Sequence, residues 1–106
     1  MKGEALKGHL DLLLLGVVRG GPAHGYAIIE ELRRRSAGTL DLPEGTVYPA
    51  LQRLEKAGLL SSGWSEGGRR RRVYELTRRG TSALREQEQD WREFSRAVEV
   101  VLKGVV

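Results

Sequence analysis

The chain has 106 residues, of which 40% are hydrophobic and 30% charged, and its formal net charge is +4. This length suits one domain, and the composition is that of a folded globular protein. Because the sequence has no cysteine, disulfides, thiolate nucleophiles and cysteine-ligated metal sites are excluded. Most of its cations are arginines, whose guanidinium groups bind phosphate in a bidentate geometry, which favours a polyanionic partner.

The sequence contains no candidate for a membrane span. The longest apolar run, Leu12 to Val18, is far shorter than the roughly 20 residues needed to cross a bilayer, and Asp11 and Arg19 flank it. The segment Met1 to Lys7 is not followed by the small-residue cleavage site of a secretory signal. We therefore expect a cytoplasmic protein with no membrane partner.

Two apolar helices are expected in the first third of the chain. From Leu6 to Val18, leucine and valine recur at helical spacing around most of the circumference, which predicts a helix buried on most sides. Gly20-Gly21-Pro22 ends this helix. A second helix contains Tyr26 and ends in Arg33-Arg34-Arg35, where cations suit the helix dipole.

The third predicted helix runs from Thr46 to Ala57 and has two contrasting faces. Pro49 is tolerated only near a helix start, so the helix begins in the loop around Glu44 and Gly45. The apolar face consists of Val47, Leu51 and Leu54. The opposite face carries mainly hydrogen-bonding and cationic side chains: Thr46, Tyr48, Pro49, Gln52, Arg53 and Lys56.

A β-hairpin follows this helix. Strands are predicted over Leu59 to Glu66 and over Arg69 to Leu76, with Gly67-Gly68 as the turn between them. On these strands Leu60 and Trp64 alternate with polar residues, as do Tyr74 and Leu76. The turn is too short for a phosphate-binding loop, so no nucleotide site is expected there.

A long helix completes the chain. Thr77 is its expected N-cap, and it runs to about Lys103 before Gly104 ends it. Its residues include a heptad-like stripe with one polar member: Leu84, Gln87, Trp91, Phe94, Val98, Val101 and Val105. A stripe this narrow requires another helix against it.

The order of these elements is that of a winged helix-turn-helix, a mainly helical α+β fold, with an added C-terminal helix. Residues 1–77 form the DNA-binding domain, and residues 78–106 form a dimerisation helix within the same compact unit. In this fold the third helix reads DNA and the hairpin, or wing, lies beside the duplex. The predicted DNA contacts on these two elements are Thr46, Tyr48, Pro49, Gln52, Arg53, Lys56, Arg69, Arg70, Arg71 and Arg72.

The roles of individual contacts stay partly open. Gln52 suits bidentate recognition of adenine, whereas Arg53 suits either guanine or a phosphate. An arginine run on a hairpin is often only a solvated surface, but this element order favours a DNA contact. Tyr26 has two interpretations of equal weight, a DNA contact or a cap on the core.

The residues also resemble a known family, the PadR family of bacterial transcriptional regulators. The resemblance extends from about Leu6 to Val101. It rests on these segments: His24-Gly25-Tyr26, residues 45–51, Arg53-Leu54-Glu55, Gly58-Leu59, residues 67–70, residues 74–77 and Gly80. The single C-terminal helix resembles that of the short members of the family.

The resemblance implies a homodimeric repressor that binds an inverted repeat, exchanges its C-terminal helix between subunits, and is nucleoid-associated when bound to DNA. It places Tyr26 and Tyr48 close to the DNA. It also implies that Trp91 lies where some short members stack flat, apolar ligands at the dimer interface. The polar and acidic segment Glu86 to Asp90 departs from that pattern.

Eight apolar residues are predicted at the dimer interface: Leu6, Leu10, Leu14, Leu84, Trp91, Phe94, Val98 and Val101. Trp91 and Phe94 have a second interpretation, as a binding site for a small planar apolar effector. Without such an effector, the regulator would respond only to its own abundance.

Two other function classes are alternatives to a DNA-binding regulator. In one, the winged helix is a scaffold and the last helix binds a different protein. In the other, the chain is an enzyme, which the absence of any catalytic constellation argues against. His9 and His24 have no carboxylate or cysteine at ligand spacing, so we expect structural roles for both and neither a metal site nor a cofactor.

Overall fold

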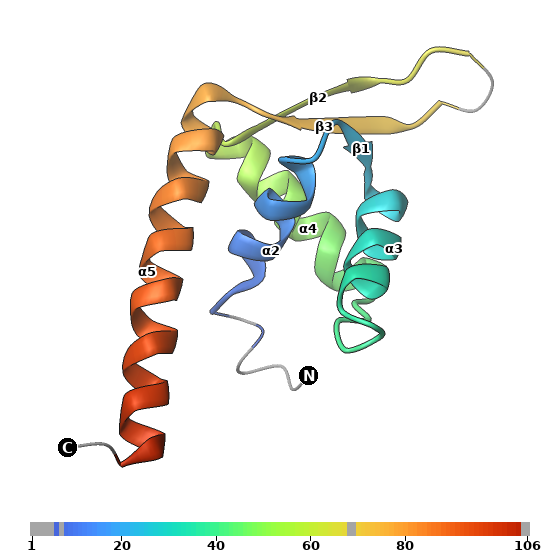
Figure 1. The fold of residues 1–106 in the computed structure, drawn as a ribbon. Coiled ribbons are helices and arrows are strands. Elements are labelled where there is room, and N and C mark those ends of the chain that lie inside the picture. The colour runs from blue at the N-terminus through green and yellow to red at the C-terminus, as the bar shows by residue number, and fades with distance from the viewer. Residues whose placement is uncertain (1–5, 7, 68–69, 105–106) are drawn as a thin grey trace.

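The computed structural model describes residue 6, residues 8–67 and residues 70–104. Within these residues the chain forms four helices and a small antiparallel sheet (Figure 1). In chain order the elements are α2 (Leu10–Val18), β1 (Ala23–His24), α3 (Gly25–Arg35), α4 (Glu44–Lys56), β2 (Leu60–Trp64), β3 (Arg72–Leu76) and α5 (Arg78–Lys103). The predicted fold class, mainly helical with a small β wing, is confirmed.

The sheet has one more strand than the predicted hairpin. Its order is β1-β3-β2, with Ala23 opposite Tyr74 and His24 opposite Val73. A strand of two residues is too short to show a period of two, so sequence periodicity could not reveal it. β1 ties the start of α3 to the wing.

The three helices α2, α3 and α4 pack below the sheet around one apolar core (Figure 1). α2 contributes buried residues on several sides, as predicted, because it contacts α3, α4 and α5. Val47, Leu51 and Leu54 form the buried face of α4, also as predicted. The helix starts at Glu44, which places Pro49 early in the helix.

The helix and strand limits differ from prediction in two places. The helix expected from Leu6 begins as α2 at Leu10, after a turn. Both wing strands are shorter than predicted, ending at Trp64 and starting at Arg72. Leu60 is 2% exposed but Trp64 is 54% exposed, because β2 leaves the core before it reaches Trp64.

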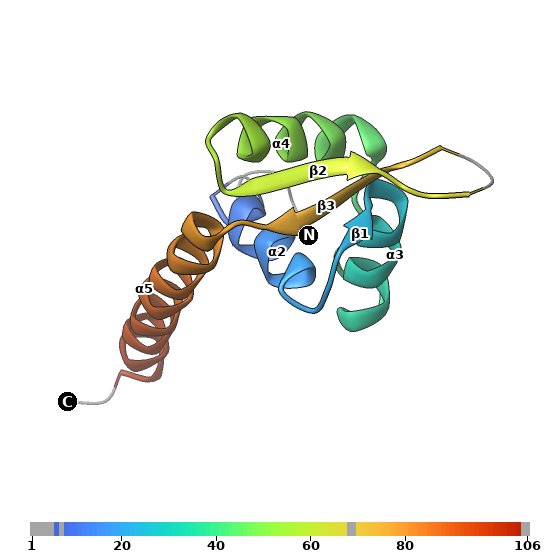
Figure 2. The ribbon, with the colours of Figure 1, turned by 90° about the horizontal axis from the view of Figure 1, so that it is seen from above.

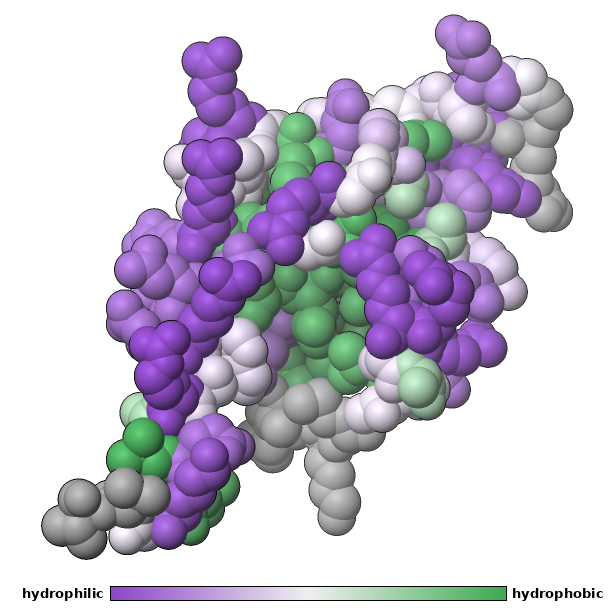
Figure 3. Space-filling model, in the orientation of Figure 1, coloured by the Kyte–Doolittle hydropathy of each residue, from purple (hydrophilic) through white to green (hydrophobic). Residues whose placement is uncertain are grey.

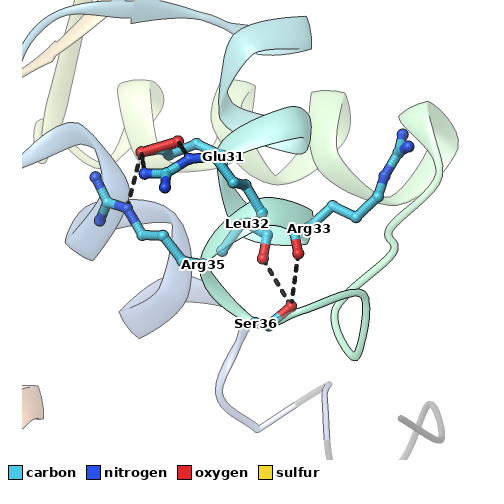
Figure 4. Close-up of polar contacts among 6 residues, drawn as sticks. Glu31, Leu32, Arg33, Arg35 and Ser36 are labelled. Atoms are coloured by element: carbon cyan, nitrogen blue, oxygen red, sulfur yellow. Dashed lines mark hydrogen bonds and ion pairs between the residues drawn. The ribbon is translucent and has the colours of Figure 1, made fainter.

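The C-terminus of α3 is held by polar contacts within one turn (Figure 4). The Ser36 hydroxyl donates to the carbonyl oxygen of Leu32 at 2.7 Å and accepts from the amide of Leu40 at 2.8 Å. Glu31 accepts from Arg34 and Arg35 at 2.7 and 2.9 Å, and these bonds lower the pKa of Glu31 to about 2. The arginine cluster of α3 is therefore already paired with carboxylates.

α5 starts with the predicted cap and then leaves the body of the molecule (Figures 1 and 2). The Thr77 side chain accepts from the amide of Gly80 at 3.0 Å, and Gly104 ends the helix with a left-handed φ of 65°. Gly80 must lack a side chain, since a Cβ there would overlap the carbonyl oxygen of Leu59. This close approach fixes α5 to the start of β2.

Two of the predicted interface residues lie in the core instead. Leu14 and Leu84 are 0% and 1% exposed in the single chain. Both belong to the core cluster of the single chain and have no surface left for a second copy, so they are not interface residues. Leu6 is also almost fully buried, whereas Leu10, Trp91, Phe94, Val98 and Val101 keep accessible surface.

Candidate nucleic-acid interface

The outer face of α4 carries the side chains predicted to contact DNA. Pro49, Gln52, Arg53 and Lys56 are exposed, and Thr46 and Tyr48 are half-buried at the two sides of this face. Pro49, Gln52, Arg53 and Lys56 line a shallow hollow of about 630 Å³ together with Glu55 and Arg72 of the wing. α4 and the wing thus share one continuous surface.

Tyr48 occupies the flank of α4 that faces the start of α3. Its ring lies where Gly25 would carry a side chain, because a Cβ at Gly25 would be 2.5 Å from Cε1 of Tyr48. Tyr26 is 56% exposed beside it. Both tyrosines line a cavity of about 480 Å³ with His24, Gly25, Arg70, Arg71 and Arg72.

His24 connects the first turn of α3 to the wing. Its Nδ1 accepts from the amide of Ala27 at 3.2 Å, which caps the helix. Its Nε2 lies 2.9 Å from Nη1 of Arg71. Burial lowers the pKa of His24, and the positive charge of Arg71 lowers it further. The predicted structural role of His24 is therefore that of a helix cap.

Among the described residues, Arg70, Arg71 and Arg72 of the wing differ from the arginines of α3 in having no carboxylate partner. Within the described residues, no ion pair joins Arg70, Arg71 or Arg72 to an acidic side chain. Arg70 and Arg72 instead lie over the Trp64 ring, at 4.5 and 4.9 Å from its centroid. Their charges are uncompensated, which suits a surface that binds phosphates. Arg69 and Gly68 lie outside the described residues.

The guanidinium group of Arg53 faces α2. Its two terminal nitrogens donate to the Asp11 carboxylate at 2.6 and 3.1 Å, and the pKa of Arg53 is raised mainly by this hydrogen bonding. Thr46 lies on the same flank of α4, and both residues line an open cavity of about 890 Å³ between α2, α4 and α5. The predicted DNA contacts on α4 are thus divided between two flanks.

The same cavity contains the aromatic residues predicted for an effector. Trp91 lies edge-on to His9 with ring centroids 4.9 Å apart, and Phe94 is 6.4 Å from Trp91. Trp91 and Phe94 are 41% and 59% exposed. Asp11, Gln87 and Asp90 contribute polar groups to the lining, so the cavity combines aromatic and acidic side chains.

The described part of the chain has neither a cluster of metal ligands nor a membrane-spanning helix. No group of three or more histidine, cysteine or acidic side chains in it is arranged to hold a metal ion. None of its helices is long and apolar enough to cross a membrane.

The structure adds three side chains that sequence reasoning did not assign to this surface. Asp11 was seen only as the charge before an apolar run, yet it pairs with Arg53 across 42 positions of sequence. Trp64 was expected on the apolar side of a strand but lies under two wing arginines. His24 contacts Arg71 only because β1 pairs with β3. No local sequence signal marks these contacts, since each joins separate elements.

A helix-turn-helix of α3 and α4, followed by a basic wing, defines a winged helix-turn-helix DNA-binding protein. The model of the "Transcriptional regulator PadR-like family" matches residues 14–86. The chain belongs to this family, and it is a DNA-binding transcriptional regulator rather than an enzyme. The resemblance noted in the sequence is confirmed.

Relatives agree with this assignment. The chain is 41% identical over 76 residues to Transcriptional regulator Rv3488 of Mycobacterium tuberculosis, covering 71% of this chain and 68% of that protein. A PadR family transcriptional regulator from Eggerthella lenta has a similar structure, with a TM-score of 0.82, 36% identity, and coverage of 93% and 86% of the two chains. A transcriptional regulator from Clostridium thermocellum has a TM-score of 0.86 and 26% sequence identity, and the match covers 92% of this chain and 96% of that chain.

Proposed function

We propose that the protein is a homodimeric repressor that binds an inverted-repeat operator through α4 and the wing. The observation that carries this proposal is the continuous surface of Gln52, Lys56 and Arg72, which is flanked by Tyr48, Arg70 and Arg71. Amide and guanidinium groups read base edges in the major groove, and unpaired cations bind phosphates. In this proposal α4 recognises the base sequence of the operator, and the wing increases the affinity for DNA.

The dimer is supported by apolar surface that one chain leaves uncovered. Along the outer half of α5, Phe94 and Val101 are 59% and 76% exposed. A second apolar surface lies between α2, α3 and α5, where Figure 3 shows a hydrophobic hollow framed by charged residues. Its floor includes Leu12, Leu13 and Leu40. Surfaces of this kind on a small domain are typical of protein interfaces.

A two-fold dimer would present two copies of α4 to successive major grooves, about 34 Å apart. This spacing is why we propose an operator of two inverted half-sites. The interface residues in this proposal are those with accessible surface, namely Leu10, Trp91, Phe94, Val98 and Val101.

The test is fluorescence anisotropy of labelled DNA from the protein's own upstream region and of a scrambled duplex, across a salt series. We expect tighter binding to the upstream DNA, weakening by about 0.9 log units per log unit of salt for each phosphate contacted. Size measurement at micromolar concentration should give a dimer. A monomer that binds both duplexes equally would contradict the proposal, and a heterodimer with another protein would favour the interaction-module alternative.

We also propose that a planar apolar effector relieves repression by entering the cavity at Trp91 and Phe94. The exposed rings and the volume of about 890 Å³ support it. Planar dyes should quench tryptophan fluorescence in the wild type and not in Trp91→Ala. Unchanged quenching in that variant would assign the signal to Trp64 and contradict the effector site, leaving control by protein abundance.

A further inference from the structure

Arg53 lies between two of the hollows that border α4. On one side is the cavity of about 890 Å³ that contains Asp11 and Trp91. On the other side is the hollow of about 630 Å³ formed by Pro49, Gln52 and Lys56 with the wing. Among the residues that line them, Arg53 is the one that belongs to both. Its side chain can therefore contact a partner in either hollow.

In the free protein the guanidinium group faces Asp11. The contact is bidentate, with nitrogen–oxygen distances of 2.6 and 3.1 Å, and it uses two N–H groups of Arg53. A carboxylate offers a pair of oxygens much as a phosphate does, and a guanine edge offers a similar pair of acceptors. Asp11 thus occupies the same donors that Arg53 would use on DNA.

The ion pair of Arg53 and Asp11 is exposed to water, which allows Arg53 to exchange Asp11 for another partner. The side chains of Arg53 and Asp11 are 57% and 34% exposed, and an ion pair this accessible to water is weak enough to break when a better partner arrives. Lys56 and the wing arginines have no such carboxylate within the described residues. Among the described cations of this surface, Arg53 is the one that must give up a carboxylate partner to bind DNA.

We propose that Asp11 determines specificity by competing with DNA for Arg53. On arbitrary DNA, the contact of Arg53 with a single phosphate does not offset the loss of its ion pair with Asp11, so Arg53 stays on Asp11. On the operator, where α4 is seated in the groove, Arg53 transfers to a bidentate acceptor and adds to binding. This inference rests on the proposed binding of DNA through α4.

The test compares Asp11→Asn with Glu88→Gln in the anisotropy assay described above. Glu88 is the control, because its carboxylate also accepts from both terminal nitrogens of one arginine, Arg19 at the C-cap of α2, at 3.0 and 3.3 Å. It accepts in addition from Arg92 at 3.2 Å, and its replacement by glutamine changes the charge by the same amount. We expect Asp11→Asn to bind the scrambled duplex roughly 3- to 10-fold more tightly and to steepen its salt dependence by about 0.9 log units, the value of one phosphate contact. Glu88→Gln should leave the salt slope unchanged.

Arg53→Gln provides a second measurement that does not depend on how Asp11 variants fold. With Asp11 intact, Arg53 makes little contribution on arbitrary DNA, so Arg53→Gln should weaken operator binding and leave binding to the scrambled duplex nearly unchanged. Adding Asp11→Asn to Arg53→Gln should then give no steeper slope. Thermal melting of each variant confirms that it is folded.

The outcomes separate the two proposals. If wild-type protein prefers its operator but Asp11→Asn behaves like Glu88→Gln, the competition is absent and the inference is overturned. Equal loss of binding to both duplexes in Arg53→Gln would also overturn it. If the wild type shows no preference for any upstream DNA, the proposed function itself fails.

Discussion

Nε2 of His24 and Nη1 of Arg71 lie 2.9 Å apart, and the same imidazole caps α3 through Nδ1. The arginine nitrogen and the amide nitrogen of Ala27 are both donors, so each contact needs an unprotonated ring nitrogen to be a hydrogen bond, and one tautomer of the neutral ring provides it for one contact at a time. A neutral imidazole has one such nitrogen, and imidazolium has none. The link between the wing and α3 is therefore sensitive to protonation of His24.

The free energy of unfolding should fall as the pH drops below about 6.5, the pKa of histidine in an unfolded chain. Burial and Arg71 lower the pKa of folded His24, so the unfolded chain binds a proton at a higher pH than the folded one does. The stabilisation is thus complete above that value and is lost as the pH falls toward the folded pKa. Urea unfolding between pH 7.5 and about 5 measures it.

His24→Asn is the control, because asparagine keeps the capping acceptor and does not titrate. Its stability should be flatter over the same pH range. Glu31 does not interfere: its pKa is lowered from 4.5 to about 2, so its contribution is complete above 4.5 and is lost only in stronger acid. An equally steep fall in His24→Asn would contradict this assignment.

Gly25→Ala should weaken DNA binding more than it weakens the fold. The new Cβ would lie 2.5 and 2.7 Å from Cε1 and Cζ of Tyr48, so the tyrosine ring must leave its position, while the helix gains the better propensity of alanine. We expect a stability change within about 1 kcal/mol and weaker operator binding. Anisotropy and thermal melting of the same sample measure both.

Gly45→Ala is the matched change for stability, since a Cβ at Gly45 meets nothing within 4 Å. It should be neutral or stabilising by up to about 1 kcal/mol. Operator affinity that survives Gly25→Ala intact would show that Tyr48 makes no DNA contact.

Gly80→Ala should destabilise the protein by about 3 kcal/mol, because a Cβ would overlap backbone atoms of Leu59 that cannot rotate away. The contact between α5 and the start of β2 would have to open. Ser82→Ala, an exposed change in the same helix, should stay within about 0.5 kcal/mol of the wild type. Chemical denaturation measures both, and similar midpoints for the two variants would contradict the close packing.

The combined variant Phe94→Asp and Val101→Asp should shift the protein from dimer to monomer. Both side chains are exposed in the single chain, so charges there leave the fold intact but oppose burial against a second copy. Sedimentation or size-exclusion chromatography at micromolar concentration measures the change. Arg96→Asp, an exposed change elsewhere on α5, should remain dimeric; a dimer in all three proteins would place the interface elsewhere.

Trp64→Ala should reduce DNA affinity without unfolding the domain. The ring is 54% exposed and holds Arg70 and Arg72 at 4.5 and 4.9 Å from its centroid. Without it, these arginines lose a cation–π contact that limits their rotamers, worth roughly 0.5–1 kcal/mol each at an exposed site. We expect affinity to fall equally on operator and scrambled DNA. A loss restricted to the operator would assign Trp64 a base-reading role instead.

The sequence by itself determined the elements that depend on neighbours within a few residues. The apolar spacing of Val47, Leu51 and Leu54 predicted the buried face of α4, and Thr77 and Gly104 predicted the ends of α5. Helix periodicity and caps act over one or two turns, so they are visible in the order of residues alone.

The tertiary structure decided which of these residues meet. It paired Asp11 with Arg53, placed Trp64 beneath the wing arginines, and buried Leu14 and Leu84 inside one copy. Each outcome depends on how far a strand or helix extends beyond the core, or on which helices pack together. These are long-range relationships, and a residue's type and spacing describe the face it occupies but not the element that faces it.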